Sequence, residues 1–257
     1  ICKKKNEVKK FLNICNLPIV VKADGIAAGK GVTICKTEKQ VIKKTSEIFN
    51  GKFKSSKIVV LEEFLDGEEA SYFIIADDNN FKFFGSAQDH KNVYENDKGP
   101  NTGGMGAYSP APIITKKLEK KIIYKIINPT LKALKVKQNP YNGFLYVGLM
   151  IKKNEPYLIE YNIRMGDPEC QVILPRLKTD IVSIFKNAIK NKLRHSKIKW
   201  IKKKSMTIVI CADGYPGSYR KNIKIKNIDK LKSSKTNFVY HAGTKIFKNE
   251  LRSNGGR

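Results

Sequence analysis

Two glycine-rich stretches contain the residues of this chain best suited to hold a ligand. KADGIAAGKGV occupies 22–32 after an apolar run, and GPNTGGMGA occupies 99–107 after Asp89-His90-Lys91. Backbone N–H groups in glycine loops form concave sites for anions, and the ammonium of Lys22 adds a compact positive charge. Glycine also lets the backbone approach a ligand closely. The pattern indicates phosphate binding, with a tight turn as the alternative for the first loop.

Acidic residues surround a short apolar pair in the segment 61–69. Leu61-Glu62-Glu63-Phe64-Leu65 ends an apolar run, and Glu68 and Glu69 follow shortly after. These carboxylates could accept hydrogen bonds from an adenine amino group or from ribose hydroxyls, with Phe64 and Leu65 as an apolar edge. An acidic turn on the surface is the simpler alternative.

A third polar group lies in the segment 158–164. Its period of two places Glu160, Asn162 and, if the strand continues, Arg164 on one face. Carboxylate and amide oxygens suit Mg²⁺ bound to a nucleoside triphosphate, and Arg164 would neutralise the remaining phosphate charge. The turn that follows adds Asp167 and Glu169, which weakens the alternative of an ordinary amphipathic edge strand.

The other reactive residues form no catalytic set. His90 lies beside Asp89, where a structural hydrogen bond is the simpler role, and neither His195 nor His241 has metal-ligand spacing. Nothing resembles a Ser-His-Asp or Cys-His arrangement. The five cysteines are odd in number and widely scattered, which argues against a disulfide framework or a zinc site and favours a reducing cytoplasm.

The formal net charge of +27 would by itself suggest nucleic-acid binding. The positive residues are mostly lysines spread from Lys3 to Lys248, whereas nucleic-acid surfaces rely on arginine and interleaved aromatic residues. We therefore expect no nucleic-acid partner and keep a basic nucleic-acid module as the rival hypothesis. No apolar run reaches the roughly 20 residues of a membrane span, so we expect no membrane partner either. We also expect a monomer.

Alternating strands and helices must position these groups. Apolar spacing predicts a helix around Val8–Cys15, a second helix that begins at the N-cap Thr37 and ends at Phe49, and an α/β (α+β) domain overall. The predicted strands are 18–22, 32–35, 58–61, 70–76 and 81–87, with a hairpin of 144–151 and 156–162. Helices are also predicted over 116–136, with a kink or restart at Pro129, and over 180–193.

The composition changes after residue 192. Residues 193–204 are polar and basic and suit a linker, and strands are expected at Met206–Cys211 and Phe238–His241. We therefore predict that 205–257 begins a second domain. The chain has no initiator methionine and stops in a turn at Ser253–Arg257, so we expect it to be a fragment.

Five segments together resemble the phosphoribosylamine–glycine ligase family, also called glycinamide ribonucleotide synthetases, of the ATP-grasp superfamily. The resemblance extends over nearly the whole chain, and its second glycine loop and GDPE turn distinguish this ligase from most ATP-grasp relatives. The segments are PIVVKADGIAAGKGV (18–32), EEFLDGEEAS (62–71), SAQDHK (86–91), GPNTGGMGAYSPAP (99–112) and IEYNIRMGDPE (159–169).

The resemblance implies an ATP-grasp domain over 1–192, with a lid subdomain to about residue 75 and a central subdomain over 76–192. A small β-rich C-terminal domain would begin at 205, and the family's N-terminal domain would precede this chain. The implied reaction joins glycine to 5-phosphoribosylamine at the expense of ATP, through glycyl phosphate, and yields glycinamide ribonucleotide, ADP and phosphate. It belongs to de novo purine synthesis.

Site roles are carried over from the resemblance by position. The catalytic residues would be Lys22, which contacts the ATP phosphates, and Arg164, which also contacts phosphate. The ligands of Mg²⁺ (or Mn²⁺) would be Glu160 and Asn162. The remaining nucleotide contacts would be the lid loop Ala27, Ala28, Gly29, Lys30 and Gly31, the adenine hinge Glu62, Glu63, Phe64 and Leu65, and the ribose ligand Glu69. The acceptor substrate would contact Asp89, Lys91, Asn101, Thr102, Gly103, Gly104, Asp167 and Glu169.

One departure from the superfamily pattern leaves the metal count open, because Leu145–Met150 carries no acidic residue. We expect residues 1–257 alone to be impaired in turnover. Within enzymes, the alternative is another ATP-grasp carboxylate–amine ligase or carboxylase of purine metabolism. A degenerate, non-catalytic relative is a third reading, against which the presence of Lys22, Glu160 and Asn162 argues.

Overall fold

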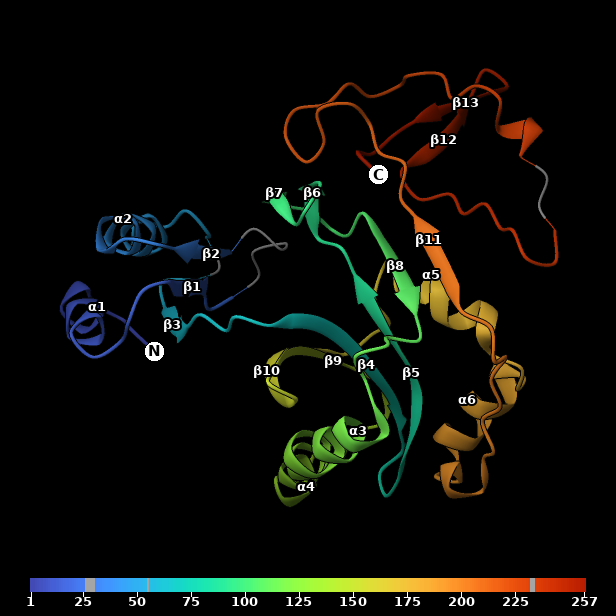
Figure 1. The fold of residues 1–257 in the computed structure, drawn as a ribbon, viewed down its shortest axis with the longest axis horizontal. Coiled ribbons are helices and arrows are strands. Elements are labelled where there is room, and N and C mark those ends of the chain that lie inside the picture. Colours follow the sequence, from blue (N-terminus) through green and yellow to red (C-terminus); the bar gives the residue numbers. More distant parts are fainter. Residues whose placement is uncertain (26–30, 55, 232–233) are drawn as a thin grey trace. The chain divides into compact units, whose positions relative to one another are not determined.

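The chain forms two compact units, Ile1–Asp66 and Gly67–Arg257 (Figure 1). The structure is a computed structural model that describes residues 1–25, 31–54, 56–231 and 234–257. The predicted end of the lid subdomain, at about residue 75, lies inside a strand of the second unit. In these described ranges no helix is long and apolar enough to cross a membrane.

The first unit is a three-stranded antiparallel sheet with two helices. Its strands have the order β2-β1-β3. Ile19 and Val21 enter an apolar core with Val41 and Ile48, because successive strand residues point to opposite faces. Lys22 therefore lies on the face away from this core. The elements are α1 (Lys5–Leu12), β1 (Ile19–Ala23), β2 (Val32–Cys35), α2 (Glu38–Phe49) and β3 (Val59–Glu63).

The predicted start of α2 is confirmed by its cap. The Thr37 side chain accepts a hydrogen bond from the Gln40 N–H at 3.3 Å, and the Gln40 side chain accepts one from the Lys36 N–H at 2.8 Å. These two bonds occupy N–H groups at a helix start that have no partner within the helix. The helix ends at Phe49, as expected.

The second unit is built on a six-stranded antiparallel sheet with the order β10-β9-β4-β5-β8-β11. Its central strand β4 is buried almost along its whole length, because helices cover both faces of the sheet (Figure 1). The strands of the sheet are β4 (Glu68–Ala76), β5 (Phe81–Asp89), β8 (Gly106–Ser109), β9 (Gly143–Lys152), β10 (Glu155–Asn162) and β11 (Ser205–Ile208). The chain between β5 and β8 forms a separate two-stranded ribbon of β6 (Asn92–Tyr94) and β7 (Lys98–Asn101).

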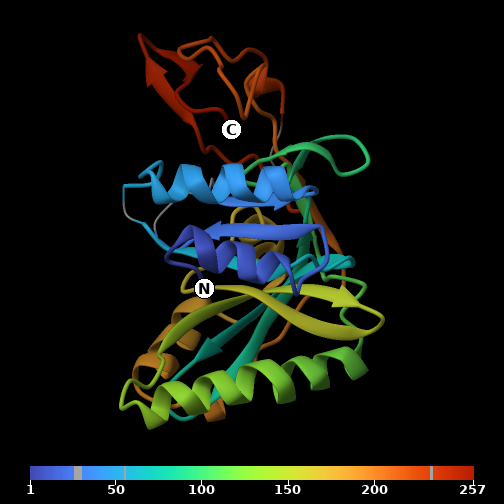
Figure 2. The ribbon, with the colours of Figure 1, turned by 90° about the vertical axis from the view of Figure 1, so that its left-hand side faces the viewer.

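One face of this sheet is covered by a single long helical stretch (Figure 2). It consists of α3 (Lys116–Ile122), a π-helical turn η1 (Ile123–Ile127) and α4 (Asn128–Val136). Pro129 lies in the first turn of α4, where its missing N–H is tolerated because the widened turn before it breaks the regular bonding pattern. The predicted restart at Pro129 is therefore confirmed.

The other face is covered by short helices that follow the hairpin β9–β10. Val172 and Ile173 of α5 pack with Ile184 and Ala188 of α6 against Phe73 of the sheet. The side chain of Asp180 caps α6 by accepting from the N–H groups at 182 and 183. The elements are α5 (Cys170–Ile173), α6 (Ile181–Ile189) and the 3-10 turns η2 (Leu174–Arg176) and η3 (Leu193–His195).

The last part of the chain differs from the sequence expectation in two ways. The strand β11 does not open a separate sheet, because it pairs antiparallel with β8 at the edge of the large sheet. The strand expected at Phe238–His241 is wrong, because these residues form no ladder and the rings of Phe238 and Tyr240 stack with each other at 6.2 Å. The remaining elements are η4 (Ile228–Lys230) and the hairpin β12 (Thr244–Phe247) and β13 (Glu250–Ser253).

Candidate active site

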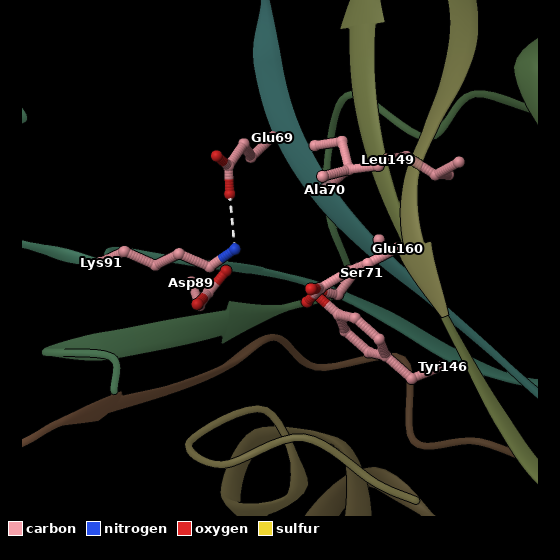
Figure 3. Close-up of a pocket in the computed structure, with 10 residues that line it drawn as sticks. Glu69, Ala70, Ser71, Asp89, Lys91, Tyr146, Leu149 and Glu160 are labelled. Carbon is pink, nitrogen blue, oxygen red and sulfur yellow. Dashed lines mark hydrogen bonds and ion pairs between the residues drawn. The ribbon is translucent and has the colours of Figure 1, made fainter. Parts of the chain in front are cut away.

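A polar pocket lies on one face of the large sheet, where four strands place side chains in neighbouring rows (Figure 3). Ser71 of β4 is opposite Gly148 of β9, and Gly148 is opposite Glu160 of β10, so the three share one row and one face. The pocket is lined by Glu69, Ala70, Ser71, Asp89, Lys91, Tyr146, Gly148, Leu149, Ile159 and Glu160.

Lys91 is the cation of this pocket. Its Nζ lies 2.8 Å from Glu69 Oε2, and the two side chains point toward each other across the opening (Figure 3). Burial lowers the pKa of Lys91, but the charges of Glu69 and Asp89 outweigh burial and hold that pKa above its usual range. The ammonium of Lys91 is therefore charged throughout the neutral range.

Two carboxyl groups lie next to this cation, the half-buried Asp89 and the buried Glu169. Burial raises the pKa of Asp89 from its ordinary 3.8, although the charge of Lys91 opposes the rise. Burial and the charge of Asp89 likewise raise the pKa of Glu169 from 4.5. Carboxyl groups with raised pKa values exchange protons more readily near neutral pH, which is the property of a general acid or base.

Glu169 is held by residues of the sheet. Its Oε1 accepts a hydrogen bond from Ser71 Oγ at 3.0 Å, and the Tyr146 hydroxyl lies 3.3 Å from the same Oγ. The residue is only 3% exposed. The buried carboxyl thus has a fixed position beside the pocket.

The predicted metal pair lies together at the end of β10. Asn162 Nδ2 donates to Glu160 Oε1 at 3.2 Å, which confirms that both side chains project from the same face. A bulge between Leu158 and Glu160 shifts the register and places Glu160 opposite Gly148. A Cβ at Gly148 would lie only 3.1 Å from Glu160 Cγ, so the glycine leaves the space that the Glu160 side chain needs.

Arg164 does not extend this row. The strand β10 ends at Asn162, and the exposed Arg164 donates from Nη1 to the Met165 carbonyl at 2.9 Å. Its predicted phosphate contact stays a prediction.

The second glycine loop is tied to the pocket through Thr102. The Thr102 N–H and Oγ1 both donate to the Lys91 carbonyl at 2.7 Å, and the Gly104 N–H donates to Thr102 Oγ1 at 3.0 Å. The Gly103 N–H donates to the Tyr215 hydroxyl at 3.1 Å, and Asn101 is exposed at the end of β7. Of these residues, which were predicted to face the acceptor substrate, Thr102 and Gly104 are linked to Lys91 by hydrogen bonds but do not line the pocket, so their predicted contact with substrate stays a prediction.

The predicted nucleotide residues of the first unit are described only in part. Lys22 Nζ forms an ion pair with Glu62 Oε2 at 2.6 Å, and the Gly31 carbonyl accepts from the Ala23 N–H at 2.9 Å. Glu63 ends β3, and Phe64 and Leu65 follow it as half-buried residues. Ala27, Ala28, Gly29 and Lys30 lie outside the described residues. The convergence of Lys22 with Glu160 on one nucleotide stays a prediction, because the two lie in different units.

Sequence reasoning missed three residues of this region. Ser71 and Tyr146 could have been found, because period-two alternation from Glu69 and from Gly148 places them on the pocket face. Arg257 gives no local signal, yet its guanidinium donates to the Gly104 carbonyl at 2.7 Å and pairs with Asp167 at 2.5 Å.

Comparison with known proteins extends over both parts of the chain. A family model described as phosphoribosylglycinamide synthetase, ATP-grasp (A) domain, matches residues 1–170, and one described as phosphoribosylglycinamide synthetase, C domain, matches residues 205–257. The chain belongs to the phosphoribosylglycinamide synthetase family. The predicted ATP-grasp fold, followed by the start of a β-rich C-terminal domain, is therefore confirmed.

Individual members of the phosphoribosylglycinamide synthetase family align with most of the chain. The phosphoribosylamine–glycine ligase of Brucella melitensis is 42% identical over 252 residues, which make up 98% of this chain and 59% of that protein. The ligase of Vigna unguiculata is 45% identical over 256 residues, which make up 97% of this chain and 82% of that protein. The chain thus spans 59% of the length of the Brucella relative.

Solved structures with a similar fold include one member of this family and one other enzyme. The crystal structure of phosphoribosylamine–glycine ligase from Thermotoga maritima is 33% identical and has a TM-score of 0.83, over 98% of this chain and 62% of that one. A biotin carboxylase domain from Hydrogenobacter thermophilus, in complex with MgADP and bicarbonate, is 18% identical with a TM-score of 0.66, over 100% of this chain and 57% of that one. The second likeness shows the shared fold alone.

Proposed function

We propose that this protein joins glycine to 5-phosphoribosylamine at the expense of ATP and forms glycinamide ribonucleotide, ADP and phosphate. A glycine carboxylate oxygen attacks the γ-phosphorus, and the bond to the β–γ bridging oxygen breaks to release ADP. The amine nitrogen of phosphoribosylamine then attacks the carbonyl carbon of glycyl phosphate. The bond from that carbon to the phosphate oxygen breaks, phosphate leaves, and the nitrogen loses a proton.

The observation that carries this proposal is the position of Glu160. Its carboxylate pairs with Asn162, and it also lines the pocket that contains Asp89 and Lys91. A ligand pair of the type that binds metal–phosphate complexes thus adjoins a pocket with both a fixed cation and carboxyl groups whose pKa values are raised. Phosphoryl transfer followed by acyl transfer requires those two environments side by side.

The donor set at Glu160 and Asn162 fits Mg²⁺. Mg²⁺ prefers oxygen ligands, keeps several waters and is usually bound through one or two carboxylates together with substrate phosphates. Glu160 Oε2 and the Asn162 amide oxygen would supply two such ligands. The described residues contain no group of three or more His, Cys, Asp or Glu side chains that could hold a metal by themselves, so the phosphates and water would complete the coordination. Bound there with ATP, Mg²⁺ would neutralise phosphate charge.

The other pocket residues would act on the amine and the acyl group. Lys91 would attract the phosphorylated intermediate, because its ammonium stays charged beside Glu69 and Asp89. Asp89 lines the pocket and has a raised pKa, so we assign it to accept the proton that the amine loses. Glu169 would fix the position of the Ser71 hydroxyl by accepting its hydrogen bond, and Ser71 in turn contacts the Tyr146 hydroxyl.

Isotope exchange tests the first step. In the full polypeptide that contains residues 1–257, ATP labelled with ¹⁸O at the β–γ bridge should scramble its label when glycine is added without phosphoribosylamine. Bicarbonate in place of glycine should give no scrambling, which separates this ligase from a carboxylase. Scrambling with bicarbonate but not with glycine would refute the proposal.

A matched pair of variants tests the site. Glu160→Gln should lower kcat at least about 100-fold, because it removes the anionic ligand that would hold Mg²⁺ against the transferring phosphoryl group. Glu155→Gln makes the same change at the other end of β10, where Glu155 pairs with Lys125 at 2.7 Å outside the pocket, and should leave kcat unchanged. Equal losses in both variants would contradict the assignment of Glu160.

A further inference from the structure

The end of the described chain reaches back to the two segments predicted to face the acceptor. Arg257 Nη1 donates to the Gly104 carbonyl at 2.7 Å, and Nη2 donates to the Asp167 carbonyl at 3.2 Å and to its carboxylate at 2.5 Å. A single guanidinium thus joins the second glycine loop to the turn that follows β10.

Arg257 suits this bridging role better than a lysine would. Its side chain is 17% exposed, whereas the Asp167 side chain is 54% exposed, so the guanidinium is the sheltered partner. The planar fork of a guanidinium directs several N–H groups at fixed angles and can bind two segments at once. An ammonium is a point charge that binds without such geometry.

The contact continues from Arg257 to the pocket through a chain of hydrogen bonds. Gly104 donates to Thr102, and Thr102 donates to the Lys91 carbonyl from both its N–H and its hydroxyl. Lys91 then pairs with Glu69 inside the pocket. On the other branch, Asp167 belongs to the same turn as Glu169, whose carboxyl is bound by Ser71.

We propose that Arg257 is a positioning residue for the acceptor amine, because it fixes the loop that carries Thr102 and Gly104 against the turn that carries Asp167 and Glu169. This inference rests on the proposed function. The step it serves is the second one, in which the amine of phosphoribosylamine attacks the carbonyl carbon of glycyl phosphate and phosphate leaves. The first step, between ATP and glycine, does not require Arg257.

The test is Arg257→Lys in the full polypeptide, with 5-phosphoribosylamine generated in the assay from ribose 5-phosphate and ammonia. The KM for phosphoribosylamine should rise roughly 10- to 100-fold, the range for loss of a hydrogen bond to a charged group. The KM for ATP and the glycine-dependent isotope exchange should stay unchanged. A merely structural role would instead lower both half-reactions together.

Arg252→Lys is the matched control. Arg252 lies in the same C-terminal segment, but it pairs locally with Glu250 at 2.5 Å and donates to the Asn222 carbonyl at 2.8 Å. It should leave the KM for phosphoribosylamine unchanged. Asp167→Asn is a second variant that should raise the same KM. Because the two residues bind each other, the double variant should raise the KM by less than the product of the two single fold-changes.

Three results would overturn the inference. They are an unchanged KM for phosphoribosylamine in Arg257→Lys, an equal rise in the Arg252→Lys control, or an equal loss of isotope exchange and acceptor turnover. Absence of glycine-dependent exchange in the unsubstituted protein would instead refute the proposed function itself.

Discussion

Gly104 is a position in the second glycine loop (99–107) where an added methyl group should be poorly tolerated. Its φ is +109°, a conformation that residues with a Cβ rarely adopt, and a Cβ there would lie 2.4 Å from Pro168 Cδ and 3.3 Å from Arg257 Nη1. The pyrrolidine ring of Pro168 is rigid and buried, so it cannot rotate away as the end of a flexible chain would. We therefore predict that Gly104→Ala separates the loop from the turn.

The magnitude follows from two contributions. Holding a residue other than glycine at such a φ costs about 1–3 kcal/mol, and forcing an extra carbon into a packed contact costs about 1–3 kcal/mol more. Gly143→Ala supplies the matched control, because φ at Gly143 is +132° and a Cβ there would meet nothing within 4 Å. The control should lose about 1–3 kcal/mol and Gly104→Ala about 2–6 kcal/mol.

The assay is unfolding by urea, followed by the fluorescence of Trp200. This is the one tryptophan in the sequence, and it packs edge-on against Phe84 with ring centroids 5.6 Å apart. Trp200, Gly104 and Gly143 all lie in the second unit, so a single probe reports on both variants. Gly104→Ala should in addition raise the KM for phosphoribosylamine, whereas Gly143→Ala should not.

Equal losses of unfolding free energy in the two variants would refute this reasoning. That result would mean that the contact with Pro168 relaxes without cost. A larger loss in Gly143→Ala would refute it more strongly, because only backbone strain acts there.

Two further predictions concern stability. Ile122→Ala removes a side chain that is 0% exposed in the core between α3 and the sheet. The unfolding free energy, measured by Trp200 fluorescence in urea, should fall by about 2–5 kcal/mol. A fall of less than about 1 kcal/mol would show that the core collapses around the gap. The second concerns Glu169, whose pKa is raised above 4.5 by burial and by the charge of Asp89. Its protonated form is favoured in the folded state, so its stabilising contribution is complete below pH 4.5 and is lost as the pH rises through the raised pKa. Glu169→Gln should therefore flatten the decline of unfolding free energy above pH 4.5, and an unchanged slope would contradict the pKa assignment.

Much of the local structure could be predicted because it depends on neighbouring residues. Thr37 and Gln40 cap α2 through bonds that span a few residues, and Pro129 restarts a helix because of its own ring. Alternation along β10 likewise put Glu160 and Asn162 on one face, and their hydrogen bond agrees. The five family segments are recognised from residue identity alone, without any structure, and the family that they indicated is confirmed.

The arrangement of the pocket was decided by tertiary structure. Strand register across β4, β9 and β10 brings Ser71 and Tyr146 to Glu169, and no periodicity within one strand reveals which strand lies beside it. Pairing with β8 likewise placed β11 in the large sheet. The apolar run Phe238–His241 did not form a strand, because no segment among the described residues pairs with it.

The sequence by itself determined which residue types are available, which helices and strands they form, and which family the chain resembles. Only the tertiary structure decided that Arg257 contacts Gly104 and Asp167, and that Lys91 pairs with Glu69 beside two carboxyl groups with raised pKa values. The physical reason is range: backbone geometry is set within a few residues, whereas burial, register and charge pairing arise when distant segments pack together.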